Sequence, residues 1–303
     1  MQDGYICNGK IIGKIGIALK EIEMKKILLI LTLIFILPNI FAQTANIKVM
    51  SYNIRCGYCE DSSDVNNWSK RKYLVAYLIK THNPDLIGLQ EAEKFQVIDL
   101  IEMLDEYDWY GVSREDGKEG GESTAILYRK KRFVTEEKIT LWLSETPLIV
   151  SKGWDAMFKR TVTVIKFKDL LSSNEFYYFN THFDHVGEIA RTESSRLLIN
   201  EIDKYSTNYP VLLTGDFNYK SDSPGYQIIT EKLYDAQFIS GNQNREDNIS
   251  FNGFGKEIQP DNKIDFIFVN EKTKVLNHTI DTTTFNGLYP SDHYPVIANI
   301  LLK

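Results

Sequence analysis

The sequence predicts a single α/β domain in which helices cover β-sheets, and three observations support this prediction. Short apolar runs such as Val211–Thr214, which fit strands buried on both faces, recur along the chain. Stretches with the apolar spacing of amphipathic helices lie between them, without strict alternation. No segment rich in Pro, Gly or Ser divides residues 43–303, and a hydrophobic content of 43% is sufficient for a large core.

Several of these apolar runs end in polar residues. Asp216 and Asn218 follow the run at 211–214, and Gln90 and Glu91 end the run that begins at Asp85. Two residues apart in extended chain, Asp216 and Asn218 project from the same face and suit a hard divalent cation or a phosphate held by one. Taken alone, an Asp-Phe-Asn turn formed for local reasons explains this stretch equally well.

The remaining elements are predicted from periodicity in chain order. Strands are expected at residues 47–54, 85–91, 123–129, 160–167, 175–181, 211–214, 263–269 and 296–302, and helices at 68–80, 94–104 and 188–205. Residues 141–158 contain Trp142 and Trp154 but show little periodicity, so a long loop or insertion is expected there. These tryptophans would either stack on a substrate or fill the space under the loop.

The amino terminus has the layout of a secretory leader. Residues 24–26 are Met-Lys-Lys, and the apolar run at 27–37 is too short to span a bilayer comfortably. We therefore predict an upstream extension plus signal peptide over residues 1–42, with cleavage after Ala42. The mature domain then covers residues 43–303, has no membrane span, and is exported to the periplasm or the extracellular space.

Charge and cysteine content limit the options further. The formal charge is −6, and because residues 1–42 hold five lysines against three acidic residues, residues 43–303 carry −8. This acidity weakly disfavours tight binding of nucleic acids, which relies on Lys and Arg. Cys56 and Cys59 remain in the mature chain, where a local disulfide and two free thiols both fit the spacing.

Six short motifs in a fixed order carry a family resemblance. They are Ser-Tyr-Asn-Ile-Arg55, Leu-Gln-Glu91, Asn-Thr-His-Phe-Asp-His185, Thr-Gly-Asp-Phe-Asn218, Ile-Asp-Phe-Ile-Phe268 and Ser-Asp-His-Tyr-Pro295. Together they resemble the endonuclease/exonuclease/phosphatase superfamily over about residues 47–302, and in particular its secreted bacterial branch with deadenylase-like motifs. The resemblance implies a four-layer α/β sandwich of two packed mixed sheets flanked by helices, with the site at one end.

The resemblance also implies a bound divalent cation, with Mg²⁺ as the first candidate and Mn²⁺ or Ca²⁺ as the others. Glu91 then resembles the principal metal ligand, and Asn53 and Asp292 would lie nearby. An acidic side chain at the end of a buried strand is costly unless it is paired or metal-bound. This argument from burial independently favours a metal ligand over an ordinary surface residue at Glu91.

Catalytic roles follow from the same resemblance. His293 resembles the general base that activates the attacking water, with Asp265 holding its other ring nitrogen. His182 resembles the residue that binds the phosphoryl oxygens, and Glu122 resembles the carboxylate that orients it. Arg160 would lie near the phosphate, although an ordinary arginine at a strand end is equally consistent with the sequence.

Asp216 and Asn218 resemble the residues that position the phosphate, the nucleophile or a second cation. The predicted protein is thus an exported, monomeric, Mg²⁺-dependent phosphoesterase that cleaves a phosphodiester, with nuclease activity among the options. Sites of this kind act on nucleic acids, lipid head groups, inositol phosphates and glycans, and the site chemistry does not choose among these substrates. A non-catalytic binding module is a further alternative, although all the expected ligands and histidines are present.

Overall fold

Two mixed β-sheets are the main elements of the computed structural model, which describes residues 24–26, 46–241 and 248–303. The first sheet contains, in spatial order, β13 (Thr273–Ile280), β14 (Val296–Leu302), β1 (Asn46–Asn53), β2 (Leu86–Gln90), β6 (Ile126–Arg129) and β4 (Tyr107–Tyr110). The second contains β11 (Tyr234–Asp235), β12 (Asp265–Val269), β10 (Val211–Asp216), β9 (Glu175–His182), β8 (Thr161–Asp169) and β7 (Phe133–Trp142). A separate two-stranded ribbon joins β3 (Ala92–Glu93) to β5 (Glu122–Ser123).

Each sheet has one pair of parallel strands joined by a helix. In the first sheet, α2 (Trp68–His82) connects β1 to β2, and in the second, α4 (Glu188–Ser206) connects β9 to β10. All other strand pairs are antiparallel. Parallel strands finish at the same edge of a sheet, so the polar residues that follow these four strands gather at one end of each sheet.

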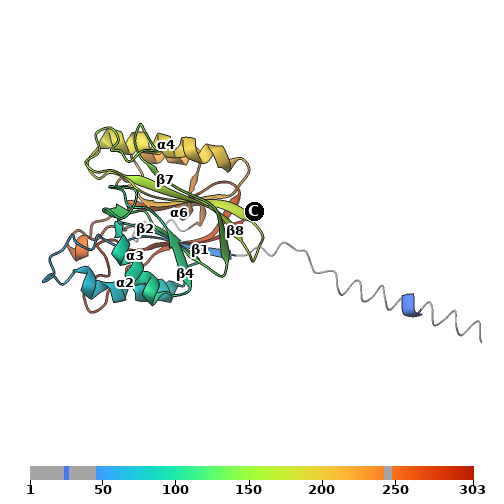
Figure 1. Cartoon of the computed structure of the whole chain (residues 1–303), viewed down its shortest axis with the longest axis horizontal. Helices are drawn as coiled ribbons and strands as arrows, with labels where there is room; N and C mark the ends of the chain where they lie inside the picture. The colour runs from blue at the N-terminus through green and yellow to red at the C-terminus, as the bar shows by residue number, and fades with distance from the viewer. Residues whose placement is uncertain (1–23, 27–45, 242–247) are drawn as a thin grey trace, which may run out of the picture. The chain divides into compact units, whose positions relative to one another are not determined.

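Helices cover the outer faces of the two sheets (Figure 1). The first sheet packs against α2 and α3 (Lys94–Met103), and the second against α4 and α5 (Pro224–Thr230). A third group of buried side chains fills the space between the sheets. These layers confirm the predicted four-layer α/β sandwich. The short α6 (Ala236–Ile239) and the 3₁₀ turn at Gly253–Gly255 complete the elements.

The space between the sheets becomes polar toward the end where the parallel strands finish. Asn180 of β9 is fully buried there. Its Nδ2 donates to the carbonyl oxygens of Leu89 (2.7 Å) and Ala125 (3.1 Å). Its Oδ1 accepts from Gln90 Nε2 (2.7 Å) and Thr214 Oγ1 (2.9 Å). With its hydrogen bonds satisfied across both sheets, Asn180 fixes one sheet against the other directly below the predicted site.

The structure contains every strand and helix that the sequence predicts, and it adds six strands and the short helices α5 and α6, which were not predicted. Four of these strands, β4, β7, β11 and β13, are the edges of the two large sheets, and the other two, β3 and β5, form the small ribbon. Edge strands are not buried on both faces, so they lack the continuous apolar runs that identify the central strands. Part of the predicted loop at 141–158 is the end of β7; the remainder is irregular.

The predicted leader lies outside the described residues, apart from residues 24–26. In the part of the chain that the structure describes, no helix is both long enough and apolar enough to cross a membrane.

Candidate active site

All ten predicted site residues lie together at the end of the sheets where the parallel strands finish. Eight of them line one cleft of about 390 Å³: Glu91, Glu122, Arg160, His182, Asp216, Asn218, Asp292 and His293. The other two lie directly behind this wall, since Asn53 is hydrogen-bonded to Glu91 and Asp216, and Asp265 is hydrogen-bonded to His293.

Strand register explains this convergence. His182 and Asp216 end the parallel strands β9 and β10 and lie opposite each other. Asp265 begins the antiparallel neighbour β12 and pairs with Asp216 in register. In the first sheet, Asn53 ends β1 opposite the last residue of β2, and Glu91 follows immediately. Each residue is therefore placed by the backbone pairing of a buried strand.

Three residues at one end of the first sheet form what we call the carboxylate wall: Asn53 in β1, Glu91 directly after β2, and Asp292 in the segment before β14. The Asn53 Nδ2 donates to Glu91 Oε1 (3.1 Å) and to Asp216 Oδ2 (2.9 Å). The Arg55 guanidinium lies 3.8 Å from Glu91 Oε2 and 3.7 Å from Asp292 Oδ2, so both carboxylates point to the same place. Burial alone would raise the pKa of Glu91, but Arg55 and other neighbours outweigh it and lower the pKa, so this carboxylate is ionised.

Backbone strain marks the same region. Arg55, Glu91 and Asn218 have φ angles of 58°, 55° and 51°, in the left-handed region that non-glycine residues adopt at a cost. Hydrogen bonds hold these conformations: Cys56 N donates to Glu91 Oε2 (3.1 Å), and Asn218 Nδ2 donates to the Phe183 carbonyl (3.0 Å). Strain at three residues around one cleft favours a functional reason over a packing one.

The donor atoms of this region fit a divalent cation. The carboxylate wall offers the oxygen ligands that Mg²⁺ prefers. In addition, Asp216, Asp265 and His293 are buried and bring one potential ligand atom each to within 4.8 Å of one another. Among the described residues, the buried Oδ1 of Asp265 has no hydrogen-bond partner, which leaves a lone pair for a cation or a water molecule. The site therefore offers two neighbouring places for a metal ion.

His293 is held between two carboxylates. Its Nδ1 lies 2.8 Å from Asp265 Oδ2, and its Nε2 lies 3.7 Å from Asp216 Oδ2. Burial lowers the pKa of His293, but the surrounding carboxylates, Asp265 foremost, outweigh it and raise the pKa to about 10. Burial and the Asp265 carboxylate also raise the pKa of Asp216, to about 7. In the metal-free protein, His293 is therefore protonated at neutral pH.

His182 has the opposite surroundings. Both of its ring nitrogens lie within 3.0 Å of Arg160 Nη1, and burial followed by Arg160 keeps the pKa of His182 well below its ordinary value. Glu122, predicted to orient this ring, lies 3.9 Å from His182 Nδ1 and instead accepts a hydrogen bond from Arg114 Nη1 at 2.6 Å. Burial and the Glu91 carboxylate raise the pKa of Glu122 to about 7.

Three cleft residues had no predicted role, namely Arg114, Phe158 and His185. Together with Arg160, which was predicted to lie near the phosphate, they form what we call the cationic corner. The Arg160 Nη2 donates to His185 Nδ1 at 3.1 Å, so this ring nitrogen is unprotonated. His185 belongs to a motif that the sequence displayed, whereas Arg114 and Phe158 lie outside all six motifs.

Asp184 connects the cationic corner to the insertion. It is fully buried and accepts hydrogen bonds from the backbone N–H groups of Met157 (3.0 Å) and Phe158 (3.1 Å). It also accepts from the N–H of Gly187 at 2.8 Å and contacts Arg160 Nε at 3.4 Å. One carboxylate thus fixes the end of the insertion and the arginine beside it.

The structure decides between the alternatives for Trp142 and for the two cysteines. Trp142 is buried and donates through Nε1 to the Arg114 carbonyl (2.8 Å), so it supports the loop from below and does not face a substrate. Cys56 and Cys59 form a disulfide with a Cα–Cα distance of 5.4 Å. The disulfide lies at the rim of the cleft, beside Glu91.

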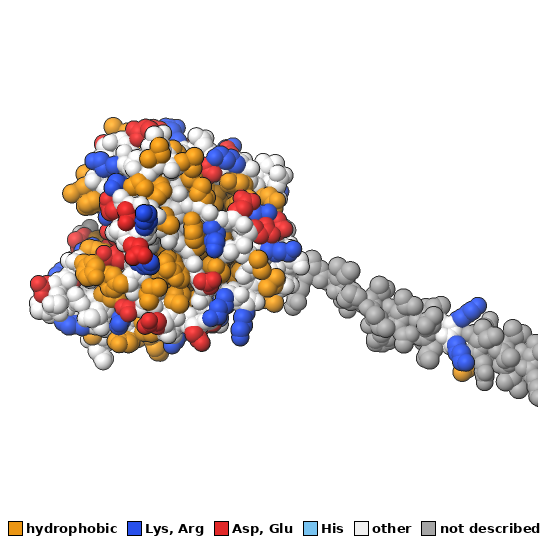
Figure 2. Space-filling view, viewed as in Figure 1, with side chains coloured by type: hydrophobic (Ala, Val, Ile, Leu, Met, Phe, Trp, Pro, Cys, Tyr) orange, Lys and Arg blue, Asp and Glu red, His pale blue; other side chains and the backbone are white. Residues whose placement is uncertain are grey.

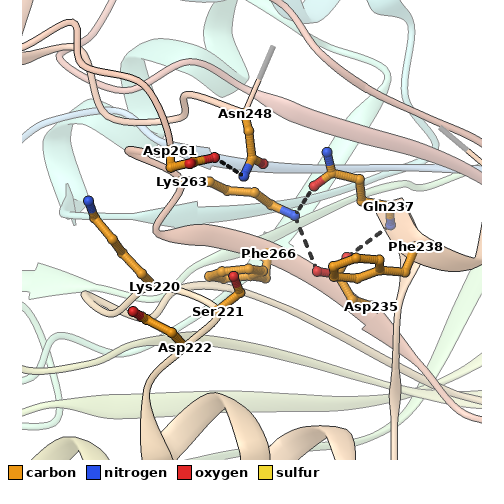
Figure 3. Close-up of a pocket in the computed structure, with 10 residues that line it drawn as sticks. All are labelled: Lys220, Ser221, Asp222, Asp235, Gln237, Phe238, Asn248, Asp261, Lys263 and Phe266. Carbon is orange, nitrogen blue, oxygen red and sulfur yellow. Dashed lines mark hydrogen bonds and ion pairs between the residues drawn. The ribbon is translucent and has the colours of Figure 1, made fainter. Parts of the chain in front are cut away.

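A second cavity of about 360 Å³ contains none of the predicted site residues (Figure 3). Its buried lysine, Lys263, contacts Asp235 Oδ2 (3.3 Å) and Gln237 Oε1 (2.6 Å), as the dashed lines in the figure show. The lysine charge is therefore balanced within the cavity wall, and we assign this cavity no role.

Comparison with known proteins supports one relationship throughout the domain. The sequence profile of the Endonuclease/Exonuclease/phosphatase family matches residues 50–293. An uncharacterized protein of Acanthamoeba polyphaga mimivirus is 30% identical over 269 residues, which cover 82% of this chain and 98% of that protein. The solved structure of a mannosyl-6-phosphatase from Bacteroides thetaiotaomicron shares 34% identity, covers 84% of this chain and 99% of its own, and superposes with a TM-score of 0.75.

A more distant relative is the CCR4-Not complex 3'-5'-exoribonuclease subunit Ccr4 of Emericella nidulans. It is 24% identical over 228 residues, which represent 65% of this chain but only 34% of that subunit. The chain therefore spans about a third of the exoribonuclease subunit, whereas it spans nearly the whole of the phosphatase.

Proposed function

Because the chain belongs to the Endonuclease/Exonuclease/phosphatase family and is a phosphoric ester hydrolase, we propose that it uses Mg²⁺ to hydrolyse a phosphate ester of a sugar. The observation that carries the proposal is the arrangement of the cleft. Oxygen ligands lie on one side of the cleft, and the pair of His182 and Arg160 lies on the other side. His293 also lines the cleft, and the Asp265 carboxylate orients its ring.

The carboxylate wall would hold the cation. Mg²⁺ bound at Glu91 and Asp292 would polarise the phosphate and stabilise the charge that develops on it. Asn53 donates to Glu91 and keeps its carboxylate directed toward that place. A carboxylate fixed in this way needs no reorganisation when the ligand arrives.

His293 is placed to handle the proton of the attacking water. Asp265 holds Nδ1, so Nε2 is the ring atom that can exchange a proton at the cleft. The surrounding carboxylates keep this proton on His293 in the metal-free protein. Neutralisation of Asp292 and Asp216 by a cation would weaken this effect and lower the pKa of His293 toward the range in which a histidine acts as a base.

The opposite side of the cleft would hold the phosphoryl oxygens. Arg160 is 5% exposed, and its guanidinium is fixed by His182, Asp184 and His185. A guanidinium held in this manner suits the planar, two-pronged contact with a phosphate. His182 is neutral, so one of its ring nitrogens carries a hydrogen that would be donated to an oxygen of the same phosphate.

A phosphorylated sugar is the preferred substrate because of similarity and charge. The mannosyl-6-phosphatase is 34% identical to this chain, and the match covers 84% of this chain and 99% of the phosphatase. Basic and acidic side chains are interspersed on the face shown in Figure 2, and residues 43–303 carry a net charge of −8. A long polyanion gains most of its affinity from clustered Lys and Arg side chains, and this distribution supplies few of them.

A phosphodiester, such as a link in RNA, is the second candidate. It is favoured by the similarity to the exoribonuclease subunit and by the deadenylase-like Thr-His-Phe-Asp-His motif at residues 181–185. Export after cleavage near Ala42 is also part of the proposal, and amino-terminal sequencing of the secreted protein tests it. A mature chain that starts far from Gln43 would contradict this cleavage site.

The decisive experiment incubates the full chain with a hexose 6-phosphate, a chromogenic diester, single-stranded RNA and single-stranded DNA in the presence of Mg²⁺. Phosphate release from the sugar that is abolished by EDTA and by His293→Ala supports the proposal. His82→Gln is the matched control, because His82 contacts Asp281 and lies outside the cleft. Cleavage of the polymers alone would favour the second candidate, and no hydrolysis of any substrate would contradict the enzymatic role.

A further inference from the structure

The cationic corner has more positive charge than one phosphate-binding arginine provides. The guanidinium carbons of Arg114 and Arg160 lie 5.0 Å and 5.8 Å from the centre of the Phe158 ring. The His185 ring stacks on the same phenyl group at 5.7 Å. Two guanidinium groups are thus held against one aromatic side chain at the wall of the cleft.

The two arginines differ in how their donors are used. All three nitrogens of Arg160 have partners, namely Asp184, His182 and His185. Arg114 donates through Nη1 to Glu122, while its buried Nε makes no hydrogen bond among the described residues. Its Nη2 has no hydrogen bond to any described residue either, so this terminal nitrogen is the donor that Arg114 offers at the cleft.

A second carboxylate, that of Glu115, lies beside Arg114. Its Oε1 is 3.4 Å from Arg114 Nε, and its other oxygen, Oε2, contacts Lys159 Nζ at 2.8 Å. The backbone around Arg114 is fixed as well, because its carbonyl accepts the Trp142 Nε1 hydrogen bond at 2.8 Å. The loop thus holds Arg114 in place although its side chain is only partly paired.

The two guanidinium groups lie on the same phenyl ring, so their positive charges repel each other. Burial and then the charge of Arg114 lower the pKa of Arg160, and the carboxylates of Glu122 and Asp184 act in the opposite direction. A bound anion between them would remove this repulsion. The size of the effect depends on the charge of the anion, and this charge differs between the two substrate candidates.

A phosphate monoester carries a charge of about −1.5 to −2 at neutral pH and has three terminal oxygens. A diester carries one negative charge and has two terminal oxygens, because the third is esterified. We infer that Arg114 determines a preference for terminal phosphate groups, by donating to the oxygen that only a monoester leaves free. The inference rests on the proposed function and specifies the class of ester within it.

The test compares two substrates with the same leaving group, p-nitrophenyl phosphate and bis(p-nitrophenyl) phosphate, on the full chain with Mg²⁺. Loss of a charge-assisted hydrogen bond in Arg114→Gln should lower kcat/KM for the monoester about 30-fold. The value for the diester should change less than about threefold on the same grounds. Arg114→Lys should fall between wild type and Arg114→Gln, because it keeps the charge but loses the fork of donors.

Arg196→Gln is the matched control, since this arginine is exposed on α4 and contacts Glu193 at 3.3 Å. Calorimetry with inorganic phosphate provides a second readout, and Arg114→Gln should bind phosphate more weakly than the wild type does.

Equal losses of kcat/KM for both substrates, or no loss of kcat/KM for the monoester, would overturn the inference. If Arg114→Gln does not fold, Arg114→Lys must still reduce the ratio of monoester to diester hydrolysis. Unequal hydrolysis by the wild type with equal losses in Arg114→Gln would overturn the inference alone. A wild-type protein that cleaves only the diester would overturn the inference and favour the phosphodiester candidate, and one that cleaves neither substrate would overturn the proposed function as a whole.

Discussion

The carboxylate wall and the cationic corner face each other across one cleft but are built in different ways. The wall comes from the first sheet, where Asn53 and Glu91 are placed by the paired ends of β1 and β2. The corner depends on loops: Arg114 follows β4, and Phe158 belongs to the insertion that precedes β8. Strand pairing fixes Asn53 and Glu91 in the wall, whereas the corner is fixed by a few polar contacts. Asp184 holds Phe158 and Arg160, and Glu122 and Trp142 hold Arg114.

This difference leads to different expectations for mutations. A substitution in the carboxylate wall removes a metal ligand but leaves the sheet intact. The activity should therefore fall while the stability of the fold is retained. A change in the support of the corner should release a loop, so stability and substrate binding should fall together. Predictions about the two sides therefore differ in kind as well as in size.

The largest effect on activity is expected from Glu91→Gln. The substitution keeps the shape of the side chain and removes the charge that would bind the cation. Loss of several kcal/mol of transition-state stabilisation corresponds to a decrease in kcat/KM of about 10³-fold. The variant should also lose the increase in Tm that Mg²⁺ gives the wild type, because a ligand stabilises only the state that binds it.

Glu175→Gln is the matched control, because Glu175 begins β9 at the end of the strand opposite to His182. It should retain both the activity and the Mg²⁺-dependent shift in Tm. If Glu91→Gln still responded to Mg²⁺ as the wild type does, the cation would be held by another group. The buried cluster of Asp216, Asp265 and His293 would then be the metal site.

The same contrast explains what could be predicted from the sequence. The wall was predictable because Asn53 and Glu91 directly follow buried apolar strands, whose pattern identifies the strand and its end. The central strands were predictable for the same reason, and the exposed edge strands were not. The seven predicted catalytic residues also lie at the cleft or directly behind it, although their roles remain predictions.

The corner was only partly predictable. Asp184 and His185 belong to a motif, but nothing in the sequence indicated that Asp184 would bind the N–H groups of the insertion. Arg114 had no local signal at all, because it reaches the cleft through the path of a loop. Its contact with Glu122 also depends on two segments whose separation in space the sequence does not give.

The second prediction concerns the support of the corner. Asp184→Asn removes a buried carboxylate that binds four backbone N–H groups, those of Met157, Phe158, Val186 and Gly187. Removal of one member of a buried charged network costs about 3 kcal/mol in the free energy of unfolding. The activity should fall about tenfold with it, since misplacement of a substrate-binding group by a fraction of an ångström is costly.

The pH dependence of stability provides a specific check on this prediction. Burial would raise the pKa of Asp184, but the backbone N–H groups outweigh it and hold the pKa well below its ordinary value. The stabilisation is therefore complete above a pH of about 4, the ordinary value for an aspartate, and is lost as the pH falls further. Urea unfolding at pH 7 and at pH 3 gives the free energy of unfolding of both proteins. The difference in this free energy between wild type and Asp184→Asn should be smaller at pH 3 than at pH 7.

Asp222→Asn, which changes an exposed aspartate, is the matched control and should leave the unfolding curve unchanged at both pH values. If the difference in the free energy of unfolding between wild type and Asp184→Asn stayed constant from pH 7 to pH 3, the stabilisation would not come from the ionised carboxylate. An Asp184→Asn protein that is less stable but fully active would show that the corner does not depend on the loop contacts.

The smallest effect is expected from loss of the Cys56–Cys59 disulfide, although it lies beside the principal metal ligand. A disulfide across so short a segment stabilises by at most about 2 kcal/mol. The segment also has a stronger support in the buried Arg71, which donates to the carbonyls of Arg55 (2.7 Å) and Pro290 (3.3 Å). The Cys56 N–H group that binds Glu91 belongs to the backbone and is kept in a serine variant.

The double variant Cys56→Ser, Cys59→Ser should therefore lose a few degrees in Tm, about 4 °C, and less than about threefold in kcat/KM. Measurement of both quantities with and without a reductant separates the disulfide from the serine side chains, because only the wild type should respond to reduction. If the double variant lost as much activity as Glu91→Gln, the disulfide would be the element that holds Glu91 in its left-handed conformation. The carboxylate wall would then depend on a loop constraint as the cationic corner does, and strand pairing alone would not explain its geometry.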